Sequence, residues 1–231
     1  MPLFERGKDY GVLSWNVFKS KKKDWAQDFV RLHSIYDILL LQEAKLNLSA
    51  PPFESYDPDY SWVFGESFVL NRCGSSCGVL TGSRIHADQA FNRHGPIREP
   101  LLNTPKSSAF AYYPILESAE RLLIINAHLI NFRTLKAFKQ QLGQITEVIS
   151  EHSGPVLFAG DLNTWSVSRK DELLNEMAKA GLSNVVFANE KRKFLLLDYI
   201  FVRGLWVKEA HLLYDIRSSD HLPLAMWFCL V

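Results

Sequence analysis

The stretch Val156–Asn163, with the sequence VLFAGDLN, contains the pattern that decides the fold. Four apolar residues form a short buried strand, and Gly160, Asp161, Leu162 and Asn163 follow where that strand ends. Asp161 and Asn163 are two residues apart, so both project from one face if the extended geometry continues. An acid and an amide on one face after a buried strand predict the centre of an active site.

Three other apolar runs end in polar residues of a similar kind. The run GVLSW ends at Asn16, ILLL ends at Gln42 and Glu43, and LLII ends at Asn126 and His128. Asn126 and His128 are again two apart and are expected to share a face. Because ligands of open α/β sheets gather beyond the carboxyl ends of the strands, we expect these residues to meet at one edge.

Two acidic positions depart from this pattern. Asp220 and His221 precede the apolar run 224–230, so that strand must run antiparallel to the other four, which predicts mixed sheets. Asp198 lies inside the apolar run 195–202, where a lone carboxylate would be costly to bury. We therefore expect Asp198 to orient the ring of His221, as a carboxylate orients a catalytic imidazole.

The remaining chain alternates many short apolar runs with few helical patterns, which predicts an α/β sandwich with more strand than helix. A helix is expected over 134–151 and a second over 23–33. A third is expected to begin at Ser168, which forms a capping-box pattern with Asp171, and to run to about Lys179. Strands are expected over 11–17, 37–41, 61–69, 78–81, 108–116, 121–127, 156–159, 195–202, 207–214 and 224–230, and loops over 49–58, 71–76, 95–106 and 183–190.

Composition limits the class of protein. A chain of 231 residues with 47% hydrophobic and 22% charged residues fits one domain over 1–231. The 26 Lys and Arg nearly balance 25 Asp and Glu, so a site for a polyanion must be local. The polar start, the absence of a bilayer-length apolar segment and three cysteines without a zinc pattern predict a cytoplasmic protein with free thiols, without membrane association.

The residue types indicate metal-assisted chemistry on phosphate. Glu43 and Asp220 are hard oxygen ligands, which favour Mg²⁺, or Mn²⁺ as a substitute, over zinc. Asp161 can take a proton from an attacking water, while Asn16 and Asn163 can hold water or phosphate without adding negative charge. The two histidines of the set can donate to phosphoryl oxygens or act as acid and base.

Six segments in this order resemble the endonuclease/exonuclease/phosphatase superfamily, which includes DNase I-like nucleases. They are Trp15-Asn16, Leu41-Gln42-Glu43, Asn126-Ala127-His128-Leu129, Gly160-Asp161-Leu162-Asn163, Leu197-Asp198-Tyr199-Ile200-Phe201 and Ser219-Asp220-His221-Leu222-Pro223. The resemblance spans nearly the whole chain. Segments such as Arg98-Glu99-Pro100 and Gly160-Asp161-Leu162-Asn163-Thr164-Trp165 are similar to its YafD-type bacterial branch.

The resemblance implies a four-layer αββα sandwich with two mixed β-sheets. It also implies Glu43 as metal ligand with Asn16 and Asp220 near it, and a role in positioning or activating water for Asp161 and Asn163. His128 would contact phosphate, and His221 would pair with Asp198. Relatives pair the first histidine with a glutamate, for which this chain offers Glu66.

Further residues are candidates for substrate binding. Lys19-Ser20-Lys21-Lys22-Lys23 follows Asn16 closely and can lie against a phosphate backbone or form a solvated loop and helix start. Trp165 can stack on a base or pack against the protein. The expected substrate contacts are Asn16, Asn126, Lys106, Arg98 and Trp165, and Arg93 and Arg133 pose the same question.

The leading hypothesis is a monomeric Mg²⁺-dependent phosphodiesterase or endonuclease that attacks nucleic acid with an activated water. A second keeps the chemistry and changes the substrate to a phospholipid or a small phosphorylated molecule such as an inositol phosphate. A third is a catalytically silent binding module on the same scaffold, which would have lost Glu43, Asp161 or His221. All three residues are present.

Overall fold

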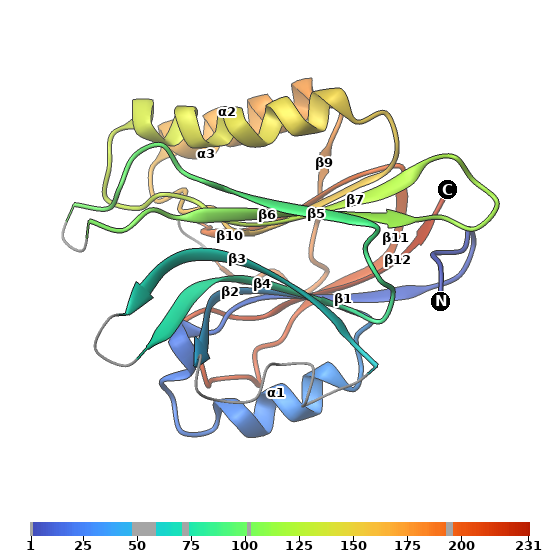
Figure 1. The fold of residues 1–231 in the computed structure, drawn as a ribbon, viewed down its shortest axis with the longest axis horizontal. Helices are drawn as coiled ribbons and strands as arrows, with labels where there is room; N and C mark the ends of the chain where they lie inside the picture. Colours follow the sequence, from blue (N-terminus) through green and yellow to red (C-terminus); the bar gives the residue numbers. More distant parts are fainter. Residues whose placement is uncertain (1, 48–58, 71–73, 101–102, 193–195) are drawn as a thin grey trace.

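The computed structural model describes residues 2–47, 59–70, 74–100, 103–192 and 196–231. Two six-stranded sheets pack face to face between outer helices. Figure 1 shows α2 (Leu135–Glu151) and α3 (Val167–Lys179) over one sheet and α1 (Trp25–His33) beneath the other. The layer order is therefore helix, sheet, sheet, helix, as the sequence predicts.

The first sheet carries α1 and has the strand order β11-β12-β1-β2-β4-β3. Within it β1 is parallel to β2 and antiparallel to β12, so the sheet is mixed and the predicted reversal of the last strand is confirmed. Its strands are β1 (Tyr10–Asn16), β2 (Ile38–Asn47), β3 (Ser61–Leu70), β4 (Ser75–Ser83), β11 (Leu205–Leu212) and β12 (Leu224–Leu230).

The second sheet carries α2 and α3 and has the order β5-β6-β7-β8-β10-β9. It is also mixed, because β7 and β8 are parallel whereas β10 is antiparallel to β8. Its strands are β5 (Gln89–His94), β6 (Ser107–Pro114), β7 (Arg121–His128), β8 (Val156–Asp161), β9 (Ser183–Asn184) and β10 (Asp198–Arg203).

Alternation along β7 explains how one strand serves two cores. Leu122 and Ile124 face the space between the sheets, while Leu123 and Ile125 face α2 and α3. The apolar stripe of α2 closes the outer core, and Thr134 caps that helix by accepting a hydrogen bond from the backbone N–H of Ala137. Both faces of the central strands are buried, so they appear as continuous apolar runs in the sequence.

The main differences from the predicted elements lie at edges and ends. The sequence predicts a loop where the two-residue β9 lies and no element where β5 lies. Both are mostly exposed edge strands without an apolar run. Helix α3 starts one residue earlier than expected, and its cap is Ser166, which accepts from Arg169 N–H, rather than Ser168. The expected loop 49–58 lies outside the described residues.

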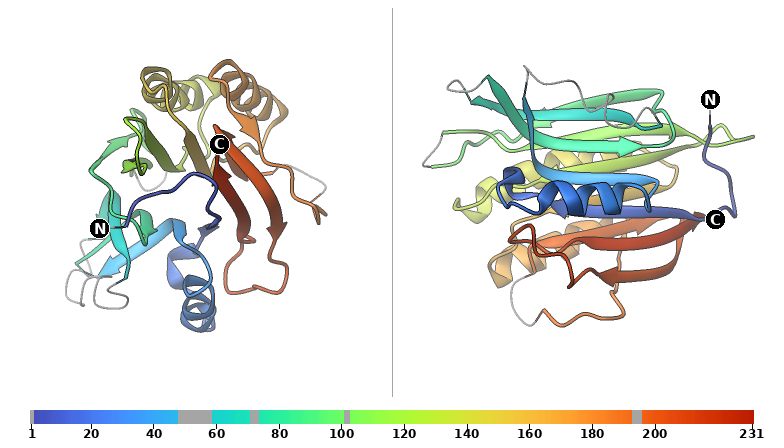
Figure 2. Two further views of the ribbon diagram at one scale, coloured as in Figure 1. Left: turned by 90° about the vertical axis from the view of Figure 1, so that its right-hand side faces the viewer. Right: turned by 90° about the horizontal axis from the view of Figure 1, so that it is seen from below.

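The topology brings the polar residues to one end of the sandwich. Asn16 and Asp161 end their strands there, and Asp198 begins its antiparallel strand there rather than lying inside it. Both termini lie at the opposite end, where Arg6 pairs with Leu230 (Figures 1 and 2). No helix in the described part of the chain is long and apolar enough to cross a membrane.

Candidate active site

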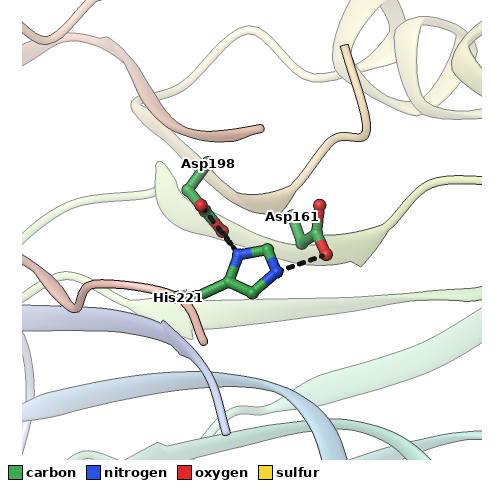
Figure 3. A group of neighbouring side chains, drawn as sticks. All are labelled: Asp161, Asp198 and His221. Atoms are coloured by element: carbon green, nitrogen blue, oxygen red, sulfur yellow. Dashed lines mark hydrogen bonds and ion pairs between the residues drawn. The ribbon is translucent and has the colours of Figure 1, made fainter. Parts of the chain in front are cut away.

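Asp161, Asp198 and His221 form the centre of the site. Strand register places Asp198 directly opposite Asp161 on the neighbouring strand, and His221 comes from the loop before β12 on the other sheet. Figure 3 shows the ring of His221 between the two carboxylates. Its Nδ1 lies 2.9 Å from Asp198 Oδ2, and its Nε2 lies 3.8 Å from Asp161 Oδ2. The expected pair of Asp198 and His221 is present in this geometry.

The charges of these three groups depend on one another. Burial opposes a charged imidazole, but the Asp198 carboxylate and its hydrogen bond outweigh burial and raise the pKa of His221 to about 10. Burial, together with the negative charge of Asp198, raises the pKa of Asp161 to about 7. Near neutral pH the site therefore contains an imidazolium and a carboxyl group that can exchange a proton.

Asn16 and His128 hold the other side of the Asp161 carboxylate. The amide nitrogen of Asn16 donates to Asp161 Oδ2 at 2.9 Å, while its amide oxygen accepts from Phe18 N–H. His128 Nε2 lies 3.3 Å from the same carboxylate oxygen. Burial, followed by the Lys106 ammonium, lowers the pKa of His128 well below its ordinary value, so this ring is neutral. Asp161 thus contacts one neutral and one protonated imidazole.

The backbone around Asp161 requires an unusual approach of two strands. A Cβ at Gly160, which has φ +151, would lie 1.8 Å from the carbonyl oxygen of Ala127, so only glycine fits beside β7. Asn163 has φ 49, so the extended geometry does not continue and the expected shared face with Asp161 is wrong. The Asn163 amide nitrogen donates to Leu129 O at 2.8 Å, and its backbone N–H donates to Asp161 Oδ1.

The sequence suggested that Glu43 follows the end of its strand. The structure places it instead at an irregularity in the middle of β2. The pairing with β4 shifts between Leu41 and Ala44, and Glu43 has φ 51. Its carboxylate accepts a hydrogen bond of 2.6 Å from Lys19 Nζ. Burial opposes ionisation, yet Lys19 lowers the pKa of Glu43 below its ordinary value. Glu43 is therefore an ionised carboxylate with an exchangeable cation beside it.

A cavity of about 230 Å³ opens next to Glu43. Lys19, Lys106 and His128 supply its polar wall, and Lys106 Nζ lies 3.0 Å from His128 Nε2. Phe68 of β3 and Phe132 of the loop after β7 form apolar walls, and Glu43 and Glu99 add carboxylates. The lining also includes Ser67, Cys77, Gly78, Pro100, Thr104 and Asn131. The cavity has the chemistry for an anionic group attached to a compact, partly apolar one.

Three predicted substrate contacts lie elsewhere. Asn126 shares the inward face of β7 with His128, but it is fully buried and its amide bonds Leu41 O, Leu80 O and Gln42, so it joins the two sheets. Arg98 is exposed and donates to Asn103 O without lining the cavity. The guanidinium carbon of Arg169 lies over the Trp165 ring, 4.6 Å from the ring centroid. This contact supports the packing role of Trp165.

The structure also bears on the basic stretch after Asn16, for which two roles were open, and on Glu66 as the expected partner of His128. Lys19 is bound to Glu43, and Lys22 donates to the carbonyls of Arg217 and Ser219, so two of the four lysines in this stretch already bond the protein. Glu66 accepts from Ser76 Oγ at 2.6 Å, whereas His128 faces Lys106 and Asp161. Arg93 forms an ion pair with Glu147 on α2.

Sequence reasoning did not identify Arg169. This buried arginine of α3 donates to Ile130 O at 2.7 Å, Asn163 O at 3.0 Å and Arg133 O at 2.7 Å. It thereby ties the loop after β8 to the loop after β7, which carries cavity residues. The signal was its spacing, because Arg169 lies four and eight residues before Leu173 and Met177, at an apolar position of the helix.

Glu43 is the carboxylate of the site best suited to a divalent cation. The ionised, cavity-facing carboxylate of Glu43 already neutralises a cation, and hard oxygen donors suit Mg²⁺ or Mn²⁺. Of the other two expected ligands, Asp220 is exposed and accepts from Ser219 Oγ. The Asn16 amide donates to Asp161 and accepts from Phe18 N–H. The ligand atoms of Asp161, Asp198 and His221 lie within 4.8 Å of one another, but the imidazolium occupies the position between those carboxylates. Glu43 therefore fits a hard cation better.

Comparisons with known proteins agree with this geometry. The model of the endonuclease/exonuclease/phosphatase family matches residues 13–221. A UPF0294 protein of Vibrio campbellii is 32% identical over 233 residues, covering 99% of this chain and 80% of that protein. It supports the expected likeness to the YafD-type branch.

Two solved structures share the fold. The catalytic domain of human Nocturnin with a bound sulfate anion has a TM-score of 0.74 and 20% identity, with 98% of this chain and 95% of that chain covered. A mannosyl-6-phosphatase of Bacteroides thetaiotaomicron has a TM-score of 0.70 and 17% identity, with 96% and 100% covered. The predicted DNase I-like sandwich is thus confirmed.

Proposed function

The chain belongs to the endonuclease/exonuclease/phosphatase family, and from this premise we propose that it is a divalent-metal-dependent phosphodiesterase that cleaves nucleic acid with an activated water. The observation that carries the proposal is the Asp161 carboxylate, which Asn16, His128 and His221 approach from three directions. Members of this family are phosphoester hydrolases, and the proposal assigns roles in that chemistry to this chain's own residues.

Asp161 is the proposed general base. Its pKa of about 7 leaves a substantial fraction ionised at neutral pH, so the carboxylate can accept the proton that water loses as it attacks phosphorus. The Asn16 amide fixes the carboxylate through its bond to Oδ2. Asn163 shapes the loop beside it through the bond of its N–H to Oδ1. A base held in this way needs little rearrangement during the reaction.

His221 is the proposed stabiliser of negative charge. Asp198 keeps its ring protonated and fixed through Nδ1, which leaves Nε2 to donate to a phosphoryl oxygen as negative charge increases in the transition state. Lys19 and Lys106 supply positive charge in the cavity, where Lys106 lies beside the neutral ring of His128. These cations face the position where an anionic phosphoester would lie.

Glu43 is the proposed principal ligand of a divalent cation, Mg²⁺ or Mn²⁺, with Asn16 and Asp220 as further candidate ligands. When bound, such an ion neutralises phosphoryl charge and stabilises the leaving oxygen. The lowered pKa of Glu43 keeps its carboxylate ionised for this task over the neutral range.

Two classes of substrate are candidates. Nucleic acid agrees with lysines close to the reacting centre in a chain whose total charge nearly cancels. A compact phosphorylated molecule, such as a sugar or inositol phosphate, is favoured by the small cavity with its Phe68 and Phe132 walls. A phospholipid headgroup belongs to the same second class because it presents similar chemistry.

One set of assays tests the proposal. Plasmid DNA, RNA, an aryl phosphodiester, an inositol phosphate and phospholipid vesicles are each incubated with Mg²⁺ or Mn²⁺, with and without EDTA. Cleavage of DNA or RNA that EDTA and Asp161→Ala both abolish is expected. Turnover of the small compounds or vesicles alone would favour the second class. Binding without turnover of any of them would support a silent module and overturn the proposal.

A further inference from the structure

The ion pair between Lys19 and Glu43 occupies the carboxylate that is proposed to bind the metal. Lys19 Nζ and Glu43 Oε2 are 2.6 Å apart, and the two side chains are 27% and 17% exposed. Such a partly buried pair is stronger than an ordinary surface ion pair, because water screens it less. Lys19 also lines the cavity together with Lys106 and His128. Its ammonium can therefore bind a second anion, the phosphate of a substrate that enters the cavity.

The backbone that carries Lys19 is strained. Phe18, Lys19 and Ser20 have φ values of 50°, 55° and 56°, a run of three left-handed residues in which none is glycine. Surrounding bonds hold this turn: Phe18 N–H donates to the Asn16 amide oxygen, and Ser20 N–H donates to Val17 O. Strain of this kind persists only where neighbouring structure enforces it, so these bonds fix the position from which the Lys19 side chain reaches Glu43.

We propose that Lys19 occupies Glu43 in the metal-free protein and transfers to the phosphate of the substrate when a divalent cation takes that carboxylate. The inference rests on the proposed function, since it requires Glu43 to bind metal. It makes two claims about Lys19: the ammonium competes with the cation for Glu43, and it contributes to phosphate binding once the cation is in place. The first lowers metal affinity, and the second raises phosphate affinity.

The first test measures the affinity for Mn²⁺ alone by isothermal titration calorimetry. Lys19→Gln removes the competing ammonium, so Mn²⁺ is expected to bind about tenfold tighter than to the wild type. Lys23→Gln is the matched control, because Lys23 is an exposed lysine of the same basic stretch. It removes the same charge without contacting Glu43. Thermal unfolding of each variant verifies that the fold is intact.

The second test titrates inorganic phosphate into the Mn²⁺-saturated proteins. Lys19→Gln is expected to bind phosphate about tenfold more weakly than the wild type, whereas Lys23→Gln stays within about twofold. Opposite directions for the two ligands distinguish transfer of the ammonium from a general loss of structure, which would weaken both.

The outcomes separate this inference from the proposed function. Mn²⁺ affinity that Glu43→Gln leaves unchanged would overturn the metal site and the inference together. Affinity that depends on Glu43 but is the same in Lys19→Gln and the wild type would overturn the inference alone. Phosphate affinity that Lys19→Gln leaves unchanged would likewise overturn the transfer.

Discussion

The two halves of the candidate site neutralise their carboxylates in different ways. In the buried half, which consists of Asn16, Asp161, Asp198 and His221, an amide at a strand end and an imidazolium that Asp198 fixes contact the acids. In the cavity half, which consists of Lys19, Glu43, Lys106 and His128, one acid contacts a long, flexible lysine. His128 also contacts Asp161 and so joins the halves.

This difference indicates a division of labour. Groups fixed by strand register can set pKa values and hold a proton acceptor in place, but they cannot be exchanged without distorting the sheets. A lysine side chain can leave a carboxylate at little structural cost, so the cavity half is suited to exchanging ions and substrate. The buried half is therefore expected to govern proton transfer, and the cavity half to govern metal and phosphate binding.

Asp161→Asn is the strongest test of whether the two halves have separate roles. The substitution keeps the shape and removes the proton acceptor, so we expect kcat to fall by about a thousandfold or more while metal affinity changes by less than about threefold. Single-turnover kinetics and Mn²⁺ calorimetry measure the two effects. A large loss of Mn²⁺ affinity would show that Asp161 is instead a metal ligand and that the halves are not separate.

Glu43→Gln gives the complementary result. We expect activity at a fixed low Mg²⁺ concentration to fall by about a hundredfold, with much of it restored at high Mn²⁺, because the amide is a weaker ligand in an otherwise intact site. Activity as a function of metal concentration is the measurement, and removal of metal with EDTA should reduce both proteins to the same baseline. Glu66→Gln is the matched control, because Glu66 bonds Ser76 outside the cavity.

The pH dependence of stability sharpens the account of the buried half. The pKa of His221 is raised to about 10 from an unfolded value of 6.5, so its contribution is complete below about pH 6.5 and is lost as pH rises towards 10. Asp161, raised to about 7, contributes in the same direction between about pH 4 and 7. The free energy of unfolding of the wild type should therefore fall between pH 6.5 and 10 through His221, by up to roughly 5 kcal/mol.

Asp198→Asn tests the cause of that slope. Without the carboxylate, the pKa of His221 falls, so the decrease in the free energy of unfolding above pH 6.5 should flatten. We also expect kcat to drop by about tenfold and to decline at alkaline pH, where the wild type stays active because His221 is still protonated. Denaturant titrations at several pH values and a pH–rate profile provide the readouts. An unchanged slope would mean that another group titrates there. Asp215→Asn, which removes an exposed acid paired with Arg31, serves as the control.

The sequence was sufficient for the strands that are buried on both faces and for the residues at their ends. Apolar runs followed by polar residues predicted β1, β7 and β8, and the antiparallel direction of β12 followed from the position of His221 before it. These features depend on local pattern and on simple topology. The family segments carried the same information in their order.

Depth and backbone irregularity could not be predicted in this way. Asn126 and His128 share a face as expected, but Asn126 lies deeper between the sheets, where it bonds Leu41 O and Leu80 O instead of a substrate. The irregularity that turns Glu43 outward and the left-handed turn that brings Lys19 to it leave no periodic signal in the sequence. Edge strand β5 was missed because its pattern is largely exposed.

The smallest expected effect on catalysis concerns the link between the two halves. Arg169 bonds Asn163 O beside the buried half and Ile130 O and Arg133 O in the loop that borders the cavity half. Arg169→Lys cannot reach all three carbonyls, so we expect kcat to fall a few-fold, about threefold to fivefold, and unfolding to cost roughly 2 kcal/mol less. Steady-state kinetics and denaturant titration give the two numbers.

A matched control comes from the far end of the sandwich. Arg203 also bonds backbone carbonyls, those of Ala180, His152 and Gly154, at the end of β10 opposite Asp198. Arg203→Lys should therefore lower stability by a similar amount and leave kcat unchanged. If both variants lose stability and neither loses activity, the loops around the two halves do not need a common anchor, and the halves act as independent units. A loss of kcat confined to Arg169→Lys shows instead that proton transfer at Asp161 depends on where the cavity loop holds the substrate.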